Sequence, residues 1–413
     1  MKSEKASFRL CIFLGFAYTM YVIGKLSFSA AMVGLIENDV LSKTETGIIS
    51  GVFWLIYAMG QIAGAFLVNK MSAYLLIEIG MIGSALSNIL MACTENFTFM
   101  LVAWCLGGAS QMGLWPGLLK LTSTEVTERH RPKLIGYLGY AYSVGSLISY
   151  FVTAGILAIG SWKYIFLLCG VICGVAVPGI IYSEKTLSPV LERVLEQETN
   201  AVSKKGKLTW RIVWDRGLIF FALLMCLRTI VENGVGSWMP TILFEVYGVS
   251  SSYSSLLSVV RIIISLLGIA LGAYVYSRTV LDELRSVFIV IVPLLPIMVI
   301  LNYLSGLSVL VVLVLLFGAT ILLAASGPRL SLNYPARYQD IGLTATIGAI
   351  MNCMSTGGMA IATYGGGYIA DHYGWNAVIL MWTILIVLFL AVAVALIPIW
   401  KRFKRNWGLK RHE

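Results

Sequence analysis

The sequence predicts an all-α integral membrane protein with twelve transmembrane helices in two six-helix halves, and its composition and length support this prediction. Of its 413 residues, 58% are hydrophobic and 12% are charged, and the mean hydropathy is +0.85. Soluble domains carry about 25% charged residues. A membrane-crossing helix needs about 20 apolar residues, so a chain of this length accommodates about a dozen helices joined by short loops.

Apolar runs long enough to cross a bilayer follow one another along the chain. We expect the helices at residues 9–35, 45–68, 73–93, 97–124, 134–159, 163–182, 217–244, 254–277, 286–304, 307–333, 342–369 and 377–400. The first run is too long for a cleavable signal peptide and lacks a convincing cleavage site, so we expect none.

Basic residues gather in alternate loops of this arrangement. They precede the first helix, follow the fourth, sixth, eighth and tenth, and form the tail, whereas the opposite loops hold only Lys43 and Lys163. Because cytoplasmic loops carry the excess of Lys and Arg, we expect a multi-pass protein of the cell (inner) membrane with both termini in the cytoplasm. Topology and headgroup attraction account for most of the net charge of +10, so the expected partner is the lipid bilayer and not nucleic acid.

One long polar segment divides the chain into two parts. We expect an N-terminal six-helix half at 1–182, a central cytoplasmic loop at 183–216, a C-terminal six-helix half at 217–400 and a basic cytoplasmic tail at 401–413. The halves share a pattern of small residues in their fifth helices: Gly136, Ser143 and Gly145 in one, and Gly348, Ser355 and Gly357 in the other. Two such halves joined by a central loop form a parallel repeat.

The stretch Trp104–Lys120 combines an apolar character with features of a solute pathway. It contains Gln111, then Trp115 and Pro116, and it ends in Lys120. Small residues let helices approach closely, and a proline frees a backbone carbonyl that a cavity or close packing can satisfy. The alternative is a packed helix whose Lys120 extends to the cytoplasmic interface.

Charged side chains inside the helices are the other candidates for function. Lys25 lies near the middle of the first helix, where a charge costs about 2.5–3.5 kcal/mol to insert, and no acidic residue is near it in that helix. We therefore favour an anion contact for Lys25 over a structural ion pair. Arg228 and Glu232 lie four residues apart on one helix face, and Arg261 lies in the eighth helix, so Glu232 is expected to pair with Arg228, Arg261 or both.

Three segments of the chain resemble the major facilitator superfamily, and within it most closely the sugar-phosphate permeases, the organophosphate:phosphate antiporters. They are Tyr21–Met32 (YVIGKLSFSAAM), Gln111–Lys120 (QMGLWPGLLK) and Gly234–Thr241 (GVGSWMPT). The resemblance implies the major facilitator fold and a substrate-anion contact for Lys25. The chain departs from the family's pattern at Glu232, where an arginine is usual, and at Arg261 in the helix that usually carries a glutamate. The usual acidic loop signature between the second and third helices is also missing.

These features together predict a secondary active transporter that moves a small organic anion by alternating access, with a site between the halves near the bilayer midplane. The residues expected to bind substrate are Lys25, Lys120, Arg228, Arg261, Gln111, Trp115, Tyr21 and Asn352. Their four cations against Glu232 give a net charge of +3, which favours a phosphorylated metabolite or a carboxylate such as a sugar acid. Two alternatives stay open: a proton-coupled carrier of a neutral solute, with Glu232 titrating, and a non-transporting membrane sensor.

An enzyme is not expected from this sequence. It contains no nucleophile–base arrangement, metal-binding cluster, phosphate-cradling glycine loop or nucleotide-binding domain. We therefore expect no cofactor and no metal, and transport that ATP does not drive. The protein is expected to be a monomer.

Overall fold

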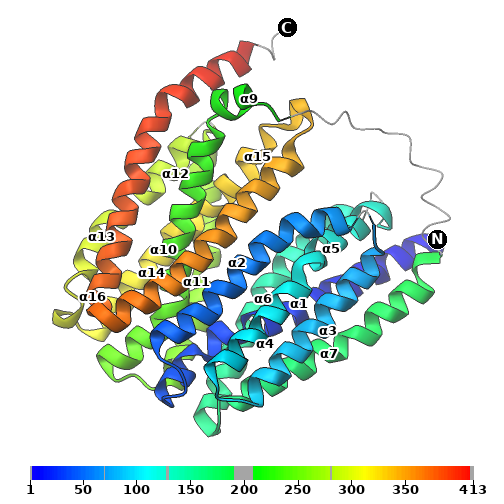
Figure 1. Cartoon of the computed structure of the whole chain (residues 1–413). Coiled ribbons are helices and arrows are strands. Elements are labelled where there is room, and N and C mark those ends of the chain that lie inside the picture. Colours follow the sequence, from blue (N-terminus) through cyan, green and yellow to red (C-terminus); the bar gives the residue numbers. More distant parts are fainter. Residues whose placement is uncertain (1, 69, 127–129, 190–207, 280, 410–413) are drawn as a thin grey trace. The chain divides into compact units, whose positions relative to one another are not determined.

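The computed structural model describes residues 2–68, 70–126, 130–189, 208–279 and 281–409, and no strand occurs within these ranges (Figure 1). The chain divides into two compact units. The N-terminal unit contains the helices up to α7 together with residues 248–262, and the C-terminal unit contains the described residues from 208 to 247 and from 263 onward. Most of the predicted central loop lies outside the described residues.

The N-terminal unit is built from seven helices that correspond to six membrane crossings. They are α1 (Lys2–Glu37), α2 (Lys43–Leu67), α3 (Ala73–Ala92), α4 (Phe97–Ser110), α5 (Leu114–Thr124), α6 (Arg131–Ile159) and α7 (Lys163–Thr186). Local sequence fixes several of their starts. Ser42 and Glu45 form a reciprocal capping box at α2, and the Asn96 side chain accepts from the Phe99 N–H at α4.

The predicted helix at 97–124 is interrupted, and this corrects the expectation of one continuous helix. A 3₁₀ turn at Gln111–Gly113 separates α4 from α5. Pro116 has no N–H to donate to the carbonyl four residues earlier, which is that of Met112. The Met112 carbonyl instead packs directly against Gly64 of α2, where any Cβ would clash with its oxygen. The break therefore depends on a proline in one helix and a glycine in its neighbour.

The C-terminal unit holds the remaining helices. They are α9 (Trp210–Asp215), α10 (Leu218–Tyr247), the later part of α11 (Ser251–Arg278), α12 (Glu283–Ile291), α13 (Leu294–Leu301), α14 (Val309–Pro328), the single-turn α15 (Tyr334–Ala336) and α16 (Thr344–Leu409). The predicted eleventh and twelfth helices are joined within α16, and Gly374, with φ of 78°, forms the kink between them. Glycine adopts this backbone conformation without steric cost.

Close packing between α10 and α16 organises the C-terminal unit, and the two helices lie side by side in Figure 1. Gly234 of α10 packs against the indole of Trp382, and Gly366 of α16 packs against the indole of Trp238. Both indoles are fully buried. Each helix thus supplies a glycine that accommodates the other helix's tryptophan.

Among the described residues, ten helical stretches are long and apolar enough to cross a membrane. The stretch Thr346–Arg405 includes the kink and accounts for two of the predicted helices. Together with the 25-residue α2, these stretches account for the twelve predicted spans.

Candidate functional site

The N-terminal unit encloses Lys25 in a pocket of aromatic rings. The Lys25 side chain is buried, with the residue only 7% exposed. Its Nζ lies 3.5 Å from the ring centroid of Tyr57, 4.9 Å from that of Trp54 and 5.6 Å from that of Tyr21. Tyr21 lies one turn before Lys25 on α1, whereas Trp54 and Tyr57 lie one turn apart on α2. A desolvated ammonium over ring faces gains about 2 kcal/mol or more from the ring quadrupoles.

No carboxylate forms an ion pair with Lys25 within the described ranges, where the ion pairs involve other cations. An ammonium has three N–H donors, and aromatic faces offset only part of the cost of removing its charge from water. A buried cation that lacks an acidic partner is suited to receive an anionic ligand.

Other predicted residues join Lys25 through Tyr21. The Tyr21 hydroxyl donates to Oε1 of Gln111 at 3.0 Å, and Gln111 is buried in the 3₁₀ turn between α4 and α5. Tyr18 stacks on Tyr21 with ring centroids 5.8 Å apart, and Trp115 packs on Tyr18 at 5.5 Å. The structure therefore brings Lys25, Tyr21, Gln111 and Trp115 into one contiguous group, which we call the Lys25 cluster.

A buried amide fixes α1 at the level of Lys25. Asn88 of α3 donates from Nδ2 to the Gly24 carbonyl at 3.0 Å, and its Oδ1 accepts from the Ser27 hydroxyl at 2.6 Å. Asn88 and Ser27 are fully buried. Sequence reasoning missed Asn88, although an amide within the apolar α3 was a signal that could have identified it.

The side chain of Lys120, which belongs to α5, extends to the C-terminal end of α2. Its Nζ donates to the Val68 carbonyl, the C-cap of α2, at 2.6 Å. A cation at this position is favourable because carbonyl groups at the C-terminus of a helix carry partial negative charge. The contact gives Lys120 a structural partner, and its part in substrate binding stays a prediction.

The C-terminal unit fixes Arg228 with several partners. Its Nε donates to the Leu323 carbonyl at 3.0 Å and to the Ser326 hydroxyl at 2.9 Å, both on α14. Its Nη2 contacts Glu232 Oε1 at 2.6 Å, so the ion pair expected from the spacing of four residues is present. Arg228 is buried, whereas the Glu232 side chain is 33% exposed. The pair thus has one enclosed member and one accessible member.

The two remaining candidates, Arg261 and Asn352, make few polar contacts among the described residues. Arg261 lies in the part of α11 that belongs to the N-terminal unit, where its Nε is buried without a hydrogen-bond partner among the described residues. Asn352 is exposed, and its backbone carbonyl accepts from the Thr356 hydroxyl at 3.0 Å. Neither environment assigns a role to these side chains.

A second polar network lies at one end of the C-terminal unit, and sequence reasoning missed it. The fully buried Glu283 accepts through Oε1 from Arg337 Nε at 2.7 Å and from the Tyr276 hydroxyl at 2.8 Å. Arg329, in a π-helical turn after α14, places its guanidinium 4.9 Å from the Tyr276 ring centroid. These residues come from α11, α12 and the segment after α14, so long sequence separations conceal the network.

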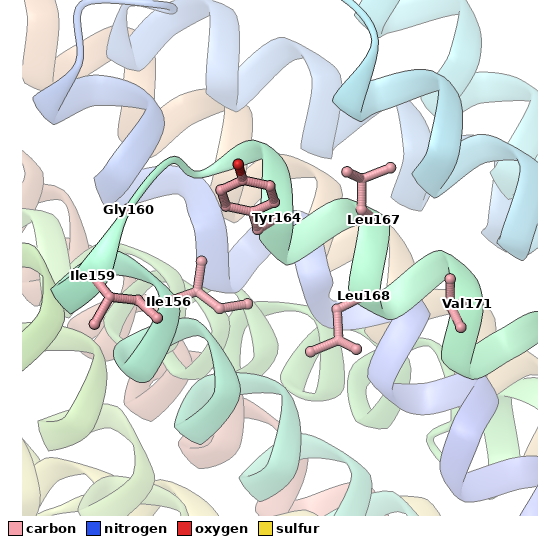
Figure 2. A pocket seen from close by; sticks show the side chains of 7 residues that line it. All are labelled: Ile156, Ile159, Gly160, Tyr164, Leu167, Leu168 and Val171. Atoms are coloured by element: carbon pink, nitrogen blue, oxygen red, sulfur yellow. The ribbon is translucent and has the colours of Figure 1, made fainter.

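An apolar groove of about 450 Å³ lies at the junction of α6 and α7 (Figure 2). It is lined by Ile156, Ile159, Gly160, Tyr164, Leu167, Leu168 and Val171. The groove contains no charged side chain and none of the predicted substrate residues, so its chemistry does not suit a small anion. The described residues also contain no group of three or more His, Cys, Asp or Glu side chains that could hold a metal ion.

Curated relatives of the chain are transporters and a sensor. It is 21% identical over 255 residues to the membrane sensor protein UhpC of Escherichia coli (strain K12), a match that covers 58% of this chain and 57% of the relative. The chain thus spans little more than half the length of that relative. It is 20% identical to a probable hexose phosphate transport protein of Chlamydia muridarum (strain MoPn / Nigg), a match that covers 100% of this chain and 95% of the relative. It is also 23% identical to the hexuronate transporter of Bacillus subtilis (strain 168), covering 67% of each.

Solved structures show the same fold. The crystal structure of a bacterial homolog to the human lysosomal transporter Spinster, in an inward-facing and unoccupied conformation, matches with a TM-score of 0.73 at 16% identity. The match covers 97% of this chain and 98% of the other. The family model described as Major Facilitator Superfamily matches residues 11–348. The chain is therefore a multi-pass membrane protein that belongs to the Major Facilitator Superfamily.

Proposed function

We propose that this protein is a secondary transporter that moves a small organic anion by alternating access. The observation that carries the proposal is the enclosed ammonium of Lys25, which has aromatic rings around it and forms no ion pair with an acidic residue among the described residues. Relatives named for hexose phosphate and hexuronate transport are consistent with an anionic cargo. The protein would act as a monomer in the cell (inner) membrane, with both termini in the cytoplasm.

The Lys25 cluster supplies complementary contacts for such a cargo. The ammonium would attract a phosphate or carboxylate group, and the Tyr21 hydroxyl and the Gln111 amide would bond to hydroxyls of a sugar-like skeleton. The faces of Tyr18 and Trp115 would pack on its apolar carbon atoms. This combination favours an organic anion over an inorganic one.

The other predicted polar and charged residues would complete the pathway. We infer that Glu232 serves as the ion-pair partner of Arg228, which α14 holds in place, and that the pair orients the site and is not a proton carrier. Arg261, Lys120 and Asn352 belong to the same proposal as further contacts. The site would lie near the bilayer midplane, where this class of transporter places its substrate.

Counterflow into proteoliposomes tests the proposal. Vesicles with the purified full-length chain would be loaded with one unlabelled anion and offered labelled hexose phosphate, hexuronate or dicarboxylate, with a neutral hexose as the control. We expect uptake of at least one anion, competition among anions and no uptake of the neutral sugar. Uptake of the neutral sugar alone, driven by a pH gradient, would overturn the proposal in favour of a proton-coupled carrier.

A sensor is the second candidate, and the similarity to the membrane sensor protein UhpC is the observation that favours it. A sensor would bind the anion without moving it. Ligand-dependent thermal stabilisation in the absence of any counterflow would therefore assign the chain to this class. Stabilisation together with counterflow assigns it to the transporters.

A further inference from the structure

The short helix α9 presents an apolar face that the protein does not cover. No residue of α9 is buried. Trp210 is 82% exposed and Trp214 is 57% exposed. The two residues lie four positions apart and therefore share one face of the helix. Two large indoles are therefore exposed on one helix face, and no described part of the protein buries them.

The position of α9 is nevertheless fixed by the residue that follows it. Arg216 forms two hydrogen bonds to the Asp340 carboxylate, at 2.9 and 2.7 Å. Its carbonyl accepts from the Tyr334 hydroxyl at 3.0 Å, and its guanidinium lies 5.2 Å from the ring centroid of Phe403 on α16. Figure 1 shows α9 beside the C-terminal end of α16. The two indoles thus belong to a helix that is held against the C-terminal unit by the contacts of Arg216, and not to a free loop.

Exposed cations lie on α9 itself and on the C-terminal end of α16. The Arg211 side chain on α9 is 90% exposed, and its Nε lies 3.6 Å from Asp215, a distance at which solvent screens an exposed pair. Lys401, Arg402 and Arg405 are exposed on α16, whereas Lys404 forms an ion pair with Asp282 at 3.0 Å that fixes this end of the helix. We use the name α9–α16 surface for Trp210, Arg211 and Trp214 of α9 together with Lys401 and Arg402 of the end of α16 that Arg216 contacts through Phe403.

We propose that the α9–α16 surface is a binding site for anionic phospholipid of the bilayer. The indoles would enter the boundary between headgroups and acyl chains, where tryptophan is enriched in membrane proteins. The cations would contact the lipid phosphate, and each basic residue near an anionic leaflet contributes about 1 kcal/mol. Two indoles and an exposed arginine on one short helix, which Arg216 fixes in place, match the two parts of a phospholipid, whereas a soluble anion would use the cations alone. The site is independent of the transported solute.

The test compares lipid headgroups on delipidated full-length protein in a neutral detergent. Short-chain phosphatidylglycerol, short-chain phosphatidylcholine and inorganic phosphate would each be titrated while binding is followed by thermal stabilisation. We expect phosphatidylglycerol to bind the wild type more tightly than phosphatidylcholine. Arg211→Gln with Arg402→Gln should weaken phosphatidylglycerol binding by about fivefold per arginine. The matched control, Arg278→Gln with Arg285→Gln, removes two exposed arginines elsewhere in the C-terminal unit and should change it less than twofold.

A second measurement follows the indoles in vesicles whose lipids carry bromine on the acyl chains. Trp210→Phe with Trp214→Phe should remove a fraction of the tryptophan fluorescence that these lipids quench. Equal loss of phosphatidylglycerol affinity in both arginine pairs would show diffuse charge attraction and overturn the site. Competition by inorganic phosphate would show a free-anion site, and unchanged quenching would place the indoles outside the membrane. Either of these results also overturns the proposal.

Discussion

At the scale of single residues, charges in this protein differ in how completely they are neutralised. The Lys25 ammonium has ring faces as its neighbours, whereas Arg228 has a carboxylate, a hydroxyl and a carbonyl. Removing a partner from the second kind leaves a buried charge without compensation. Removing Lys25 itself leaves no charge behind. We therefore expect the loss of Lys25 to weaken ligand binding more than stability, and the loss of a partner of Arg228 to weaken stability more than ligand binding.

Lys25→Gln should weaken binding of the transported anion by about 10- to 100-fold, the range for losing a hydrogen bond to a charged group. The protein should stay folded, because the change removes a buried charge that has no acidic partner among the described residues. Ligand-dependent thermal shifts measure both properties. Lys163→Gln is the control, since Lys163 pairs with Glu95 at the surface and should not affect affinity. Unchanged affinity in Lys25→Gln contradicts the anion site. Lys25→Arg should not rescue binding, because a planar guanidinium does not fit a pocket shaped around an ammonium.

Glu232→Gln should lower the stability of the protein by roughly 2 kcal/mol, less than for a fully buried pair because Glu232 is partly exposed. The stranded charge is that of Arg228, which α14 holds in place. Unfolding temperature in detergent measures the effect. Glu245→Gln on the same helix serves as the control, because a glutamine oxygen can still accept from the Trp375 indole. The contrary result is a stable Glu232→Gln that exchanges substrate between equal compartments but loses pH-driven accumulation. Glu232 would then be a proton site.

At the scale of elements, the sequence allows the helices to be predicted but not their irregularities. Apolar composition and length are enough to place each span. The 3₁₀ turn at Gln111 depends on how Pro116 and Gly64 meet across two helices, and sequence distance conceals that meeting. The pair of Arg228 and Glu232 follows from their spacing, whereas Trp54 enters the Lys25 pocket from another helix and leaves no local signal. Contacts within one helix are therefore predictable, and contacts between helices are not.

The loop before α12 gives a prediction about pH. Burial tends to raise the pKa of Asp282, but hydrogen bonds from the Arg285 N–H, the Lys404 ammonium and the Trp400 indole outweigh it and hold the pKa below its usual range. The stability that this carboxylate contributes is therefore complete above its unfolded pKa of about 3.9 and is lost as pH falls through the lower folded value.

Asp282→Asn should accordingly lower the unfolding temperature at pH 7 by about 2–4 °C, the shift expected for a loss near 1 kcal/mol in a large domain. It should also flatten the decline of the unfolding temperature as pH falls from about 4 toward 2. Differential scanning fluorimetry across that range measures both. Asp215→Asn, which alters an exposed carboxylate, should leave the pH profile as in the wild type. An Asp282→Asn profile identical to that of the wild type contradicts the assignment.

At the scale of the whole molecule, the distribution of basic residues predicts the orientation of the protein in the membrane. Reporter fusions after Arg216 and after Arg405 should both read cytoplasmic, because the loops on that side carry nearly all of the lysines and arginines. Paired alkaline phosphatase and fluorescent protein fusions give opposite signals on the two sides. An external signal at either position contradicts the proposed orientation.

One feature of the division into units bears on how the chain assembles. Residues 248–262 lie beyond the central loop in sequence but belong to the N-terminal unit. There Ile262 packs with Ala30 and Tyr150, and the Ser252 hydroxyl donates to the Ala154 carbonyl at 2.7 Å. A fragment that ends in the central loop lacks these partners. The two pieces of a gene cut there should therefore accumulate in membranes only when they are expressed together. Folding of the N-terminal unit would then be completed only after residues 248–262 have been synthesised.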